Sequence, residues 1–392
     1  MAGHNALLDQ RFMSLALALG RRGLGNTWPN PAVGAVVVHR DGEPVIVGRG
    51  WTQPGGRPHA ETEALRRAGA AARGATLYAT LEPCSHHGRT PPCTDAIMAA
   101  GIARVVSAIE DPNALAGRGH ALLRASGIAV DVGVGAAEAR RAHAGHIRSV
   151  CDHRPHVSLK LAVSADGKVA LAGRKPVAIT GEPARARVHL MRAMNDAILI
   201  GIGTALADDP QLTCRLPGMA SRSPVRVVFD TGLRLPVTGA LVRSARETPV
   251  WVMAGADAPV EAEAALVTRG VEVFRLQRVR GQESGVRNEE GAAARTFLTP
   301  RSRFLIPDAL HLLAERGITR LMVEGGPTVA AALVAADLVD EAVLLRSPNP
   351  IGPDGIDALE AMPLTALTDS PKLRSLGVET VGADTIETFE RT

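Results

Sequence analysis

The sequence predicts an α/β protein built from two domains. Its 392 residues are too many for one compact core of ordinary size, because a domain takes about 150 residues. Two successive groups of apolar, strand-like runs alternate with helical stretches, which is the pattern of an α/β fold. A polar, proline-containing segment interrupts this alternation near residue 152. We therefore expect one domain over residues 1–152 and a second over residues 153–392.

The first domain is expected to begin with a helix. Residues 5–21 place leucine, methionine and alanine at helical intervals, and a glycine-rich stretch follows them. Alanine-rich segments near residues 60–73 and 94–100 favour two further helices, and residues 136–151 are helical and polar. Apolar runs predict strands at residues 32–39, 43–50, 75–82, 103–110 and 128–134.

The second domain repeats the alternation. Helices are expected near residues 185–194 and 328–336. Residues 278–296 are polar and rich in glycine without any apolar period, and they predict a surface loop. Strands are predicted at residues 156–164, 197–203, 225–230, 249–254, 271–276, 320–326 and 340–346.

Composition excludes several classes of protein. The apolar fraction of 46% with 21% charged residues is that of a globular protein, and no segment approaches about 18 uncharged apolar residues. Asp9, Gln10 and Arg11 stand where a secretory signal would need apolar side chains. We therefore expect a cytoplasmic protein without membrane contact. A net charge of +4 with scattered arginines favours small anionic substrates over nucleic acid.

Cysteine use indicates thiols or metal ligands rather than disulfides. The chain has four cysteines, Cys84, Cys93, Cys151 and Cys214, too few for a disulfide framework at this length. Two of them follow prolines, as Pro83-Cys84 and Pro92-Cys93, and an upstream His59-Ala60-Glu61 completes a pattern typical of zinc binding.

One imidazole and two thiolates suit tetrahedral zinc and leave its fourth position open for water. Bound zinc lowers the pKa of that water from about 15.7 to about 7, so the site predicts hydrolysis, with Glu61 as the proton shuttle. His59 and Glu61 would diverge by about 200° on an ideal helix, so the motif must lie at a helix start. A closed structural zinc with His86 or His87 as the fourth ligand is the alternative.

The order of these motifs resembles the zinc nucleobase deaminases, in which the activated water attacks an amine-bearing ring carbon. Eight residues, SHHGRTPP, separate the cysteines here, whereas two are common in those enzymes. NTWPNPAVGAVVV, HAETEAL, LYATLEPCSHHGRTPPC and DPN together resemble the bifunctional riboflavin biosynthesis deaminase/reductase family. The resemblance implies a cytidine-deaminase-like α/β/α sandwich, Asn30 on the pyrimidine, and His86, His87 and Arg89 near the ribose phosphate.

From residue 156 onward the resemblance continues through LKLAVSADGKVA, ARARVHLMRAMNDAILIGIGTALADDPQLTCR, PVRVVFD and LMVEGGPTV. It implies a dihydrofolate-reductase-like α/β domain that uses NADPH to reduce the ribosyl chain to ribityl. The implied substrate of the first reaction is 2,5-diamino-6-(5-phosphoribosylamino)pyrimidin-4-one. The implied cofactor-binding residues are Ala162, Ala178, Thr204, Asp208, Gly326, Pro327 and Thr328, and the substrate-binding residues are Lys160, Pro176, Arg192, Leu212, Arg215 and Glu324.

The chemistry of these residues agrees with that assignment. Glu324-Gly325-Gly326 follows a predicted strand and precedes a helix, where small residues let a pyrophosphate approach the backbone. Taken alone, the glycines would equally suit an ordinary tight turn. Ala178 stands where relatives commonly carry a tryptophan and Pro176 replaces a small polar residue, so we expect moderately weaker NADPH binding than in those relatives.

Two rival functions are weaker. A transfer-RNA adenosine deaminase shares the zinc motif, but it should carry an aromatic, basic surface, and aromatic residues make up 3% of this chain. A non-enzymatic binding module would not require an intact His59, Glu61, Cys84 and Cys93. A homo-oligomer, dimer or tetramer, is expected because apolar cores of this richness often form dimers.

Overall fold

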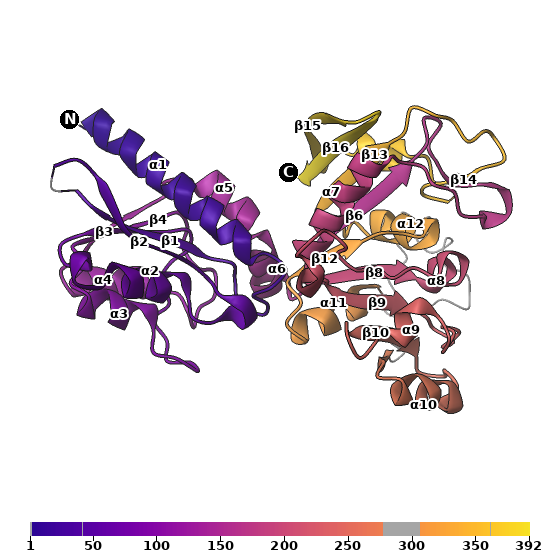
Figure 1. The fold of residues 1–392 in the computed structure, drawn as a ribbon, viewed down its shortest axis with the longest axis horizontal. Coiled ribbons are helices and arrows are strands. Elements are labelled where there is room, and N and C mark those ends of the chain that lie inside the picture. Colours follow the sequence, from indigo (N-terminus) through magenta and orange to yellow (C-terminus); the bar gives the residue numbers. More distant parts are fainter. Residues whose placement is uncertain (1, 41, 277–305, 361) are drawn as a thin grey trace, which may run out of the picture. The chain divides into compact units, whose positions relative to one another are not determined.

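The computed structural model describes residues 2–40, 42–276, 306–360 and 362–392 (Figure 1). The chain divides into two compact units, the first formed by Met1–Arg154 with Arg316–Thr319 and the second by Pro155–Glu315 with Arg320–Thr392. Each unit combines helices with a β-sheet, which confirms the predicted α/β class. The loop predicted at residues 278–296 lies outside the described residues.

The first unit contains a sheet whose described strands follow the order β2-β1-β3-β4-β5. β1 runs antiparallel to β2 and β3, whereas β3, β4 and β5 are parallel. Helices α1 and α5 lie on one side of the sheet, and α2, α3 and α4 lie on the other (Figure 1). The elements are α1 (Ala2–Gly20), β1 (Gly34–His39), β2 (Val45–Trp51), α2 (Ala60–Ala68), β3 (Thr76–Ala79), α3 (Cys93–Ala99), β4 (Arg104–Ser107), α4 (Gly119–Ala125), β5 (Ala129–Val132), α5 (Ala136–Ala142) and α6 (Ala144–Asp152).

Close approach of helices to the sheet explains several small residues in this unit. A Cβ at Gly34 would lie 1.8 Å from the carbonyl oxygen of Ala16, so α1 packs directly onto the backbone of β1. Gly48 and Gly50 of β2 meet α2 in the same way. Because α2 is held against β1 and β2, its first turn has a fixed position at the end of the sheet.

The second unit contains a larger sheet whose described strands follow the order β11-β10-β9-β8-β12-β6-β13-β16-β15. In this order, the strands from β11 at the edge as far as β13 pair in parallel. β16 pairs antiparallel with β13, and β15 pairs antiparallel with β16. Its strands are β6 (His156–Val163), β8 (Ala197–Gly201), β9 (Val225–Phe229), β10 (Val250–Gly255), β11 (Glu272–Leu276), β12 (Arg320–Val323), β13 (Glu341–Arg346), β15 (Leu373–Val381) and β16 (Asp384–Arg391).

Helices and a small second sheet complete this unit. The sheet pairs β7 (Lys168–Ala170) with β14 (Ile356–Asp357). The carboxyl ends of the parallel strands β8, β12 and β6 lie side by side, which is where α/β sheets bind ligands. The helices are α7 (Glu182–Ala193), α8 (Ile202–Asp208), α9 (Ala240–Arg243), α10 (Val260–Thr268), α11 (Ile306–Glu315), α12 (Pro327–Ala335) and α13 (Thr365–Thr368).

The structure differs from the sequence-based expectations in elements of both units. Residues 136–151 form two helices, because His143 leaves helical geometry and ends α5 before α6 begins. Helix α4 of the first unit was not predicted from the apolar pattern, and neither were α9, α10, α11 and α13 of the second. The hairpin of β15 and β16 was also missed, since most of β15 is exposed on both faces and carries no alternating apolar signal.

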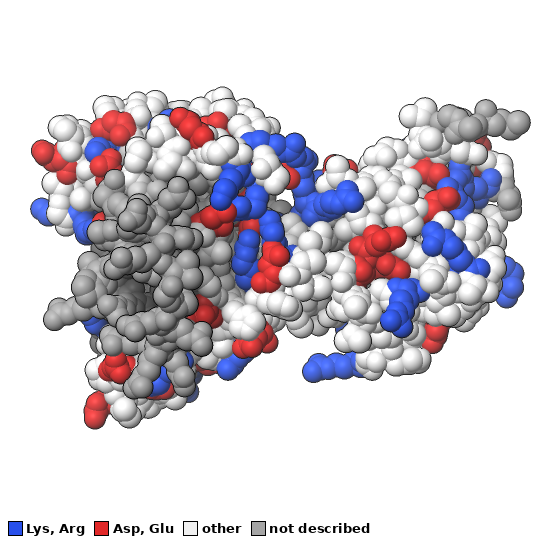
Figure 2. Space-filling view, turned by 180° about the vertical axis from the view of Figure 1, so that it is seen from behind, with Lys and Arg blue, Asp and Glu red and all other residues white. Residues whose placement is uncertain are grey.

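Charged side chains of both signs are mixed on the surface. On the face shown in Figure 2, acidic side chains lie among the basic ones over both units. This distribution agrees with the small net charge of +4.

Candidate active sites

The first candidate site begins at the start of α2. His59 is the N-cap of this helix and has extended backbone geometry, with φ −68° and ψ 159°. Glu61 lies in the first helical turn and is buried, at 3% exposure. The change in backbone direction between the two residues lets both side chains line one pocket, which confirms the prediction that the motif lies at a helix start.

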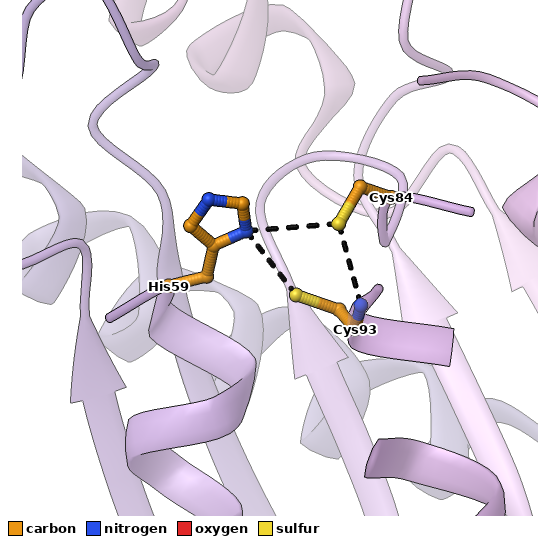
Figure 3. A group of neighbouring side chains, drawn as sticks. All are labelled: His59, Cys84 and Cys93. Atoms are coloured by element: carbon orange, nitrogen blue, oxygen red, sulfur yellow. Dashed lines mark hydrogen bonds between the residues drawn. The ribbon is translucent and has the colours of Figure 1, made fainter. Parts of the chain in front are cut away.

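Two cysteines reach the same point from other segments (Figure 3). Cys93 is the first residue of α3, and Cys84 precedes the inserted loop after β3. The His59 Nδ1 atom lies 3.3 Å from Cys93 Sγ and 3.6 Å from Cys84 Sγ. The backbone N–H of Cys93 donates to Cys84 Sγ over 3.3 Å. These three ligand atoms lie within 4.8 Å of one another, close enough to share one metal ion.

The donor set fits zinc, because imidazole nitrogen and thiolate sulfur are the ligands that zinc prefers. Within the described part of the chain, His59, Cys84 and Cys93 form the one group of potential ligands close enough together to hold a metal ion. Neither His86 nor His87 belongs to this group. The arrangement therefore supports a three-ligand site rather than the closed structural alternative. A hydrogen bond from the Cys93 thiol lowers the pKa of Cys84, and the same bond together with burial raises the pKa of Cys93.

Burial controls the ionisation of Glu61. Removal from solvent raises the pKa of this carboxyl to about 7, although the neighbouring His59 works to lower it. A carboxyl that titrates near neutral pH can both accept and release a proton under working conditions, which is what a proton shuttle requires.

A pocket of about 180 Å³ is lined by two of the three ligands, His59 and Cys84. Asn30 and His86 line it, as expected for substrate-binding residues, and the Asn30 amide also donates to the Gly56 carbonyl over 2.8 Å. Arg89 is exposed in the inserted loop and is not among the side chains that line the pocket. His87 is also exposed and lies 3.8 Å from Asp95.

Sequence reasoning missed several polar residues of this pocket. Arg57, Thr90, Glu82 and His146 all line it, together with Asp111 and Asn113 of the DPN motif. Arg57 stands two residues before His59, so its position near the zinc motif was a usable signal. The sequence carried no such signal for His146, because this residue lies in a polar helical segment far along the chain from the zinc motif.

The second candidate site is a cavity of about 670 Å³ in the second unit. It lies at the carboxyl ends of β6, β8 and β12, where the ends of adjacent parallel strands meet. All of the residues expected to bind cofactor or substrate in this unit line it: Lys160, Ala162, Pro176, Ala178, Arg192, Thr204, Asp208, Leu212, Arg215, Glu324, Gly326, Pro327 and Thr328.

A buried ion pair connects two walls of this cavity. Arg192 of α7 donates from Nε and Nη2 to the two carboxylate oxygens of Glu324 over 2.6 and 2.8 Å, and from Nη1 to the Thr213 carbonyl over 3.1 Å. The two side chains are 12% and 8% exposed. Burial acts to raise the pKa of Glu324, but the charges of Arg192 and Lys160 outweigh it and hold that pKa below its ordinary value.

Lys160 of β6 lies on the same wall. Burial lowers the pKa of its ammonium group, while the carboxylate of Glu324 opposes that shift. The two groups are adjacent because β6 pairs with β12, with Leu159 opposite Val323. Arg215, by contrast, is exposed at the rim, where it donates to Gln211.

Backbone geometry at the strand ends leaves room for a phosphorylated cofactor. Gly326 is the N-cap of α12, and a Cβ there would lie 2.8 Å from the Thr204 hydroxyl of α8. The first turns of α8 and α12 therefore approach each other closely, with their amide groups at one edge of the cavity. Such paired helix starts are suited to binding a pyrophosphate.

Comparison with known proteins agrees with both sites. Residues 7–109 match the family model of the cytidine and deoxycytidylate deaminase zinc-binding region. Residues 155–386 match the model of the RibD C-terminal domain. The fold and the two sites thus define a bifunctional enzyme, a hydrolytic deaminase joined to a reductase.

Full-length relatives identify the family. The chain is 39% identical to the riboflavin biosynthesis protein RibD of Escherichia coli (strain K12), over 96% of this chain and 97% of that protein. It is 35% identical to RibD of Mycobacterium tuberculosis (strain H37Rv), over 95% and 94%. The chain belongs to the RibD family, which acts in riboflavin biosynthesis with zinc and NADPH.

Solved structures show the same architecture. A Thermotoga maritima diaminohydroxyphosphoribosylaminopyrimidine deaminase/5-amino-6-(5-phosphoribosylamino)uracil reductase superposes with a TM-score of 0.81 at 33% identity, covering 99% of this chain and 100% of that chain. Acinetobacter baumannii RibD gives a TM-score of 0.81 at 32% identity, covering 99% of both chains. The expected cytidine-deaminase-like and reductase folds are thereby confirmed.

Over the residues that the structure describes, no helix is both long and apolar enough to cross a bilayer.

Proposed function

We propose that residues 1–152 deaminate 2,5-diamino-6-(5-phosphoribosylamino)pyrimidin-4-one and that residues 153–392 then reduce the ribosyl chain of the product with NADPH. The observation that carries the first half is the meeting of His59, Cys84 and Cys93 beside a buried Glu61. The second half is supported by the cavity at the strand ends, which all of the expected reductase residues line.

In the first unit, His59, Cys84 and Cys93 hold zinc, which when bound supplies a water activated for attack at neutral pH. Glu61 takes a proton from that water and delivers it to the departing amine. Asn30 orients the pyrimidine at the pocket wall, with its side chain held by Gly56. His86 and Arg89, on the exposed loop between the cysteines, bind the ribose phosphate.

In the second unit, NADPH supplies the hydride when bound. Gly326, Pro327 and Thr328 at the start of α12, together with Thr204 and Asp208 of α8, bind the cofactor, and Ala162 and Ala178 line its path along the cavity. Lys160, Arg192 and Glu324 form the polar wall that orients the substrate. Arg215, exposed at the rim, binds its phosphate, while Pro176 and Leu212 pack against the pyrimidine.

The remaining proposals concern the setting of the enzyme. It works in the cytoplasm on small phosphorylated pyrimidines, as a homo-oligomer (dimer or tetramer), without nucleic-acid or membrane partners. On the one face that Figure 2 shows, acidic and basic side chains are mixed, whereas proteins that bind nucleic acid gather lysine and arginine on one face.

The direct test uses the purified chain with the diaminopyrimidine ribotide, with and without NADPH, alongside a measurement of bound zinc. We expect one zinc per chain, deamination without NADPH, and consumption of NADPH that begins only after deamination. Removal of zinc by a chelator should abolish deamination while leaving reduction of the pre-deaminated intermediate intact. Loss of both activities on chelation would contradict the separate assignment.

A further inference from the structure

A buried carboxylate in the deaminase pocket is held in place from several sides. The backbone N–H of Asp111 donates to Glu82 Oε2 over 3.1 Å, which fixes the loop that carries it. The Asp111 Oδ1 atom accepts the N–H of Asn113 over 2.9 Å. The same oxygen lies 2.8 Å from His146 Nε2. The Asp111 side chain is 6% exposed, so little bulk solvent reaches it.

His146 reaches this carboxylate from a different element. It lies in α6, at a separation of 35 residues from Asp111, and its side chain is 10% exposed. Both side chains line the pocket that also contains Asn30 and Glu61. The contact is therefore part of the pocket wall and not only a tether for the helix.

The chemistry of the contact determines which atom is left for a ligand. An ionised carboxylate only accepts hydrogen bonds, so His146 must carry its proton on Nε2 and donate it to Oδ1. The Asn113 N–H donates to the same oxygen, so both of these contacts use Oδ1 and neither uses Oδ2. Because Asp111 lines the pocket, Oδ2 is the atom left to accept a hydrogen bond from a donor of the substrate.

The proposed substrate offers such donors, because its pyrimidine carries amino groups and its ribose carries hydroxyls. We propose that His146 is a positioning residue of the deaminase: it fixes the Asp111 carboxylate so that its free oxygen accepts an N–H or O–H of the aminopyrimidine ribotide. The inference rests on the proposed deaminase function of this pocket.

His146→Leu removes the donor, and His146→Gln retains an amide N–H. With the ribotide as substrate, the leucine variant should lower deaminase kcat/KM by about 10- to 100-fold, mainly through a higher KM, because an interaction made equally in ground and transition state is lost. The glutamine variant should recover most of that loss. Both should keep one zinc per chain and wild-type reduction of the deaminated intermediate, which serves as an internal reference in the same preparation.

His143→Leu is the matched control. His143 is also buried and contacts a side chain, Thr80, over 3.0 Å, but it does not line the pocket. Its loss should leave the deaminase KM unchanged even if the unit becomes less stable. Equal KM changes in both leucine variants, loss of zinc from His146→Leu, or an unchanged KM in that variant would each overturn the proposal.

These outcomes are separable from failure of the proposed function. If the unmodified enzyme does not deaminate the ribotide, the function itself is wrong. If the unmodified enzyme does deaminate the ribotide and the His146 variants have the same deaminase KM, the function stands and the positioning role alone is refuted.

Discussion

The two active sites are built in different ways. The deaminase site depends on side chains with particular chemistry, of which His59 and Cys93 stand at the very start of a helix. The reductase site depends on the ends of three neighbouring strands, where much of the cofactor surface is backbone and small side chains. Replacing one group of the metal site should therefore cause a large loss of deaminase activity. Replacing one residue of the distributed cofactor site should cause smaller changes in the stability or the NADPH affinity of the reductase.

The sharpest expected failure is at Glu61. Glu61→Gln keeps the size of the side chain and leaves the three zinc ligands in place, but it removes the group that moves the proton. Deamination should fall by about 10²- to 10⁴-fold, with zinc content and NADPH-dependent reduction unchanged. Steady-state rates for both half-reactions and the zinc content provide the measurement. A deamination rate near that of the unmodified enzyme would remove Glu61 from the mechanism.

A smaller effect is expected from breaking the buried ion pair of the reductase. Glu324→Gln leaves Arg192 without its counter-charge, and loss of one partner from a nearly buried pair costs about 3 kcal/mol. Denaturant unfolding followed by circular dichroism should show this decrease in the free energy of unfolding. The matched control is Glu379→Gln, because its pair with Arg187 is exposed and should contribute less than about 1 kcal/mol. Equal effects of the two substitutions would contradict the distinction.

Gly326→Ala tests the close approach of the two helix starts. The added Cβ would lie 2.8 Å from the Thr204 hydroxyl, so Thr204 must shift where the cofactor is expected to bind. The dissociation constant for NADPH should rise about tenfold, equivalent to about 1.4 kcal/mol. Gly232→Ala serves as control, because the nearest atom to its Cβ is 3.7 Å away and the residue lies outside the cavity lining. An unchanged affinity in Gly326→Ala would show that the cofactor does not use this edge.

The smallest expected effect is a gain. Ala178 is exposed in the cavity, and Ala178→Trp would restore an aromatic surface there, worth roughly 0.5–1.5 kcal/mol. NADPH should bind up to about tenfold more tightly with little change in turnover, as measured by its dissociation constant and by rates at saturating pyrimidine substrate. Weaker binding would mean that another side chain already fills the space.

The sequence predicted the two sites by different routes and with different completeness. The zinc ligands were predictable because each belongs to a short motif with its own proline, and because the geometry of a helix start follows from spacing alone. The reductase residues were predictable only through resemblance to a family. The ion pair of Arg192 with Glu324 joins residues 132 apart, and the contact of His146 with Asp111 joins residues 35 apart. No local pattern encodes either pairing, since each arises when strands and helices pack.

Residues 316–319 make the first unit discontinuous in the sequence. The polypeptide leaves the first unit at residue 155, re-enters it for these four residues, and leaves again at Arg320 to form β12. Ile318 within the returning segment is fully buried, and a Cβ on Gly317 would lie 3.0 Å from Pro29. A single cut near residue 152 therefore does not follow this division, because residues 316–319 would stay with the carboxyl-terminal fragment although they belong to the first unit.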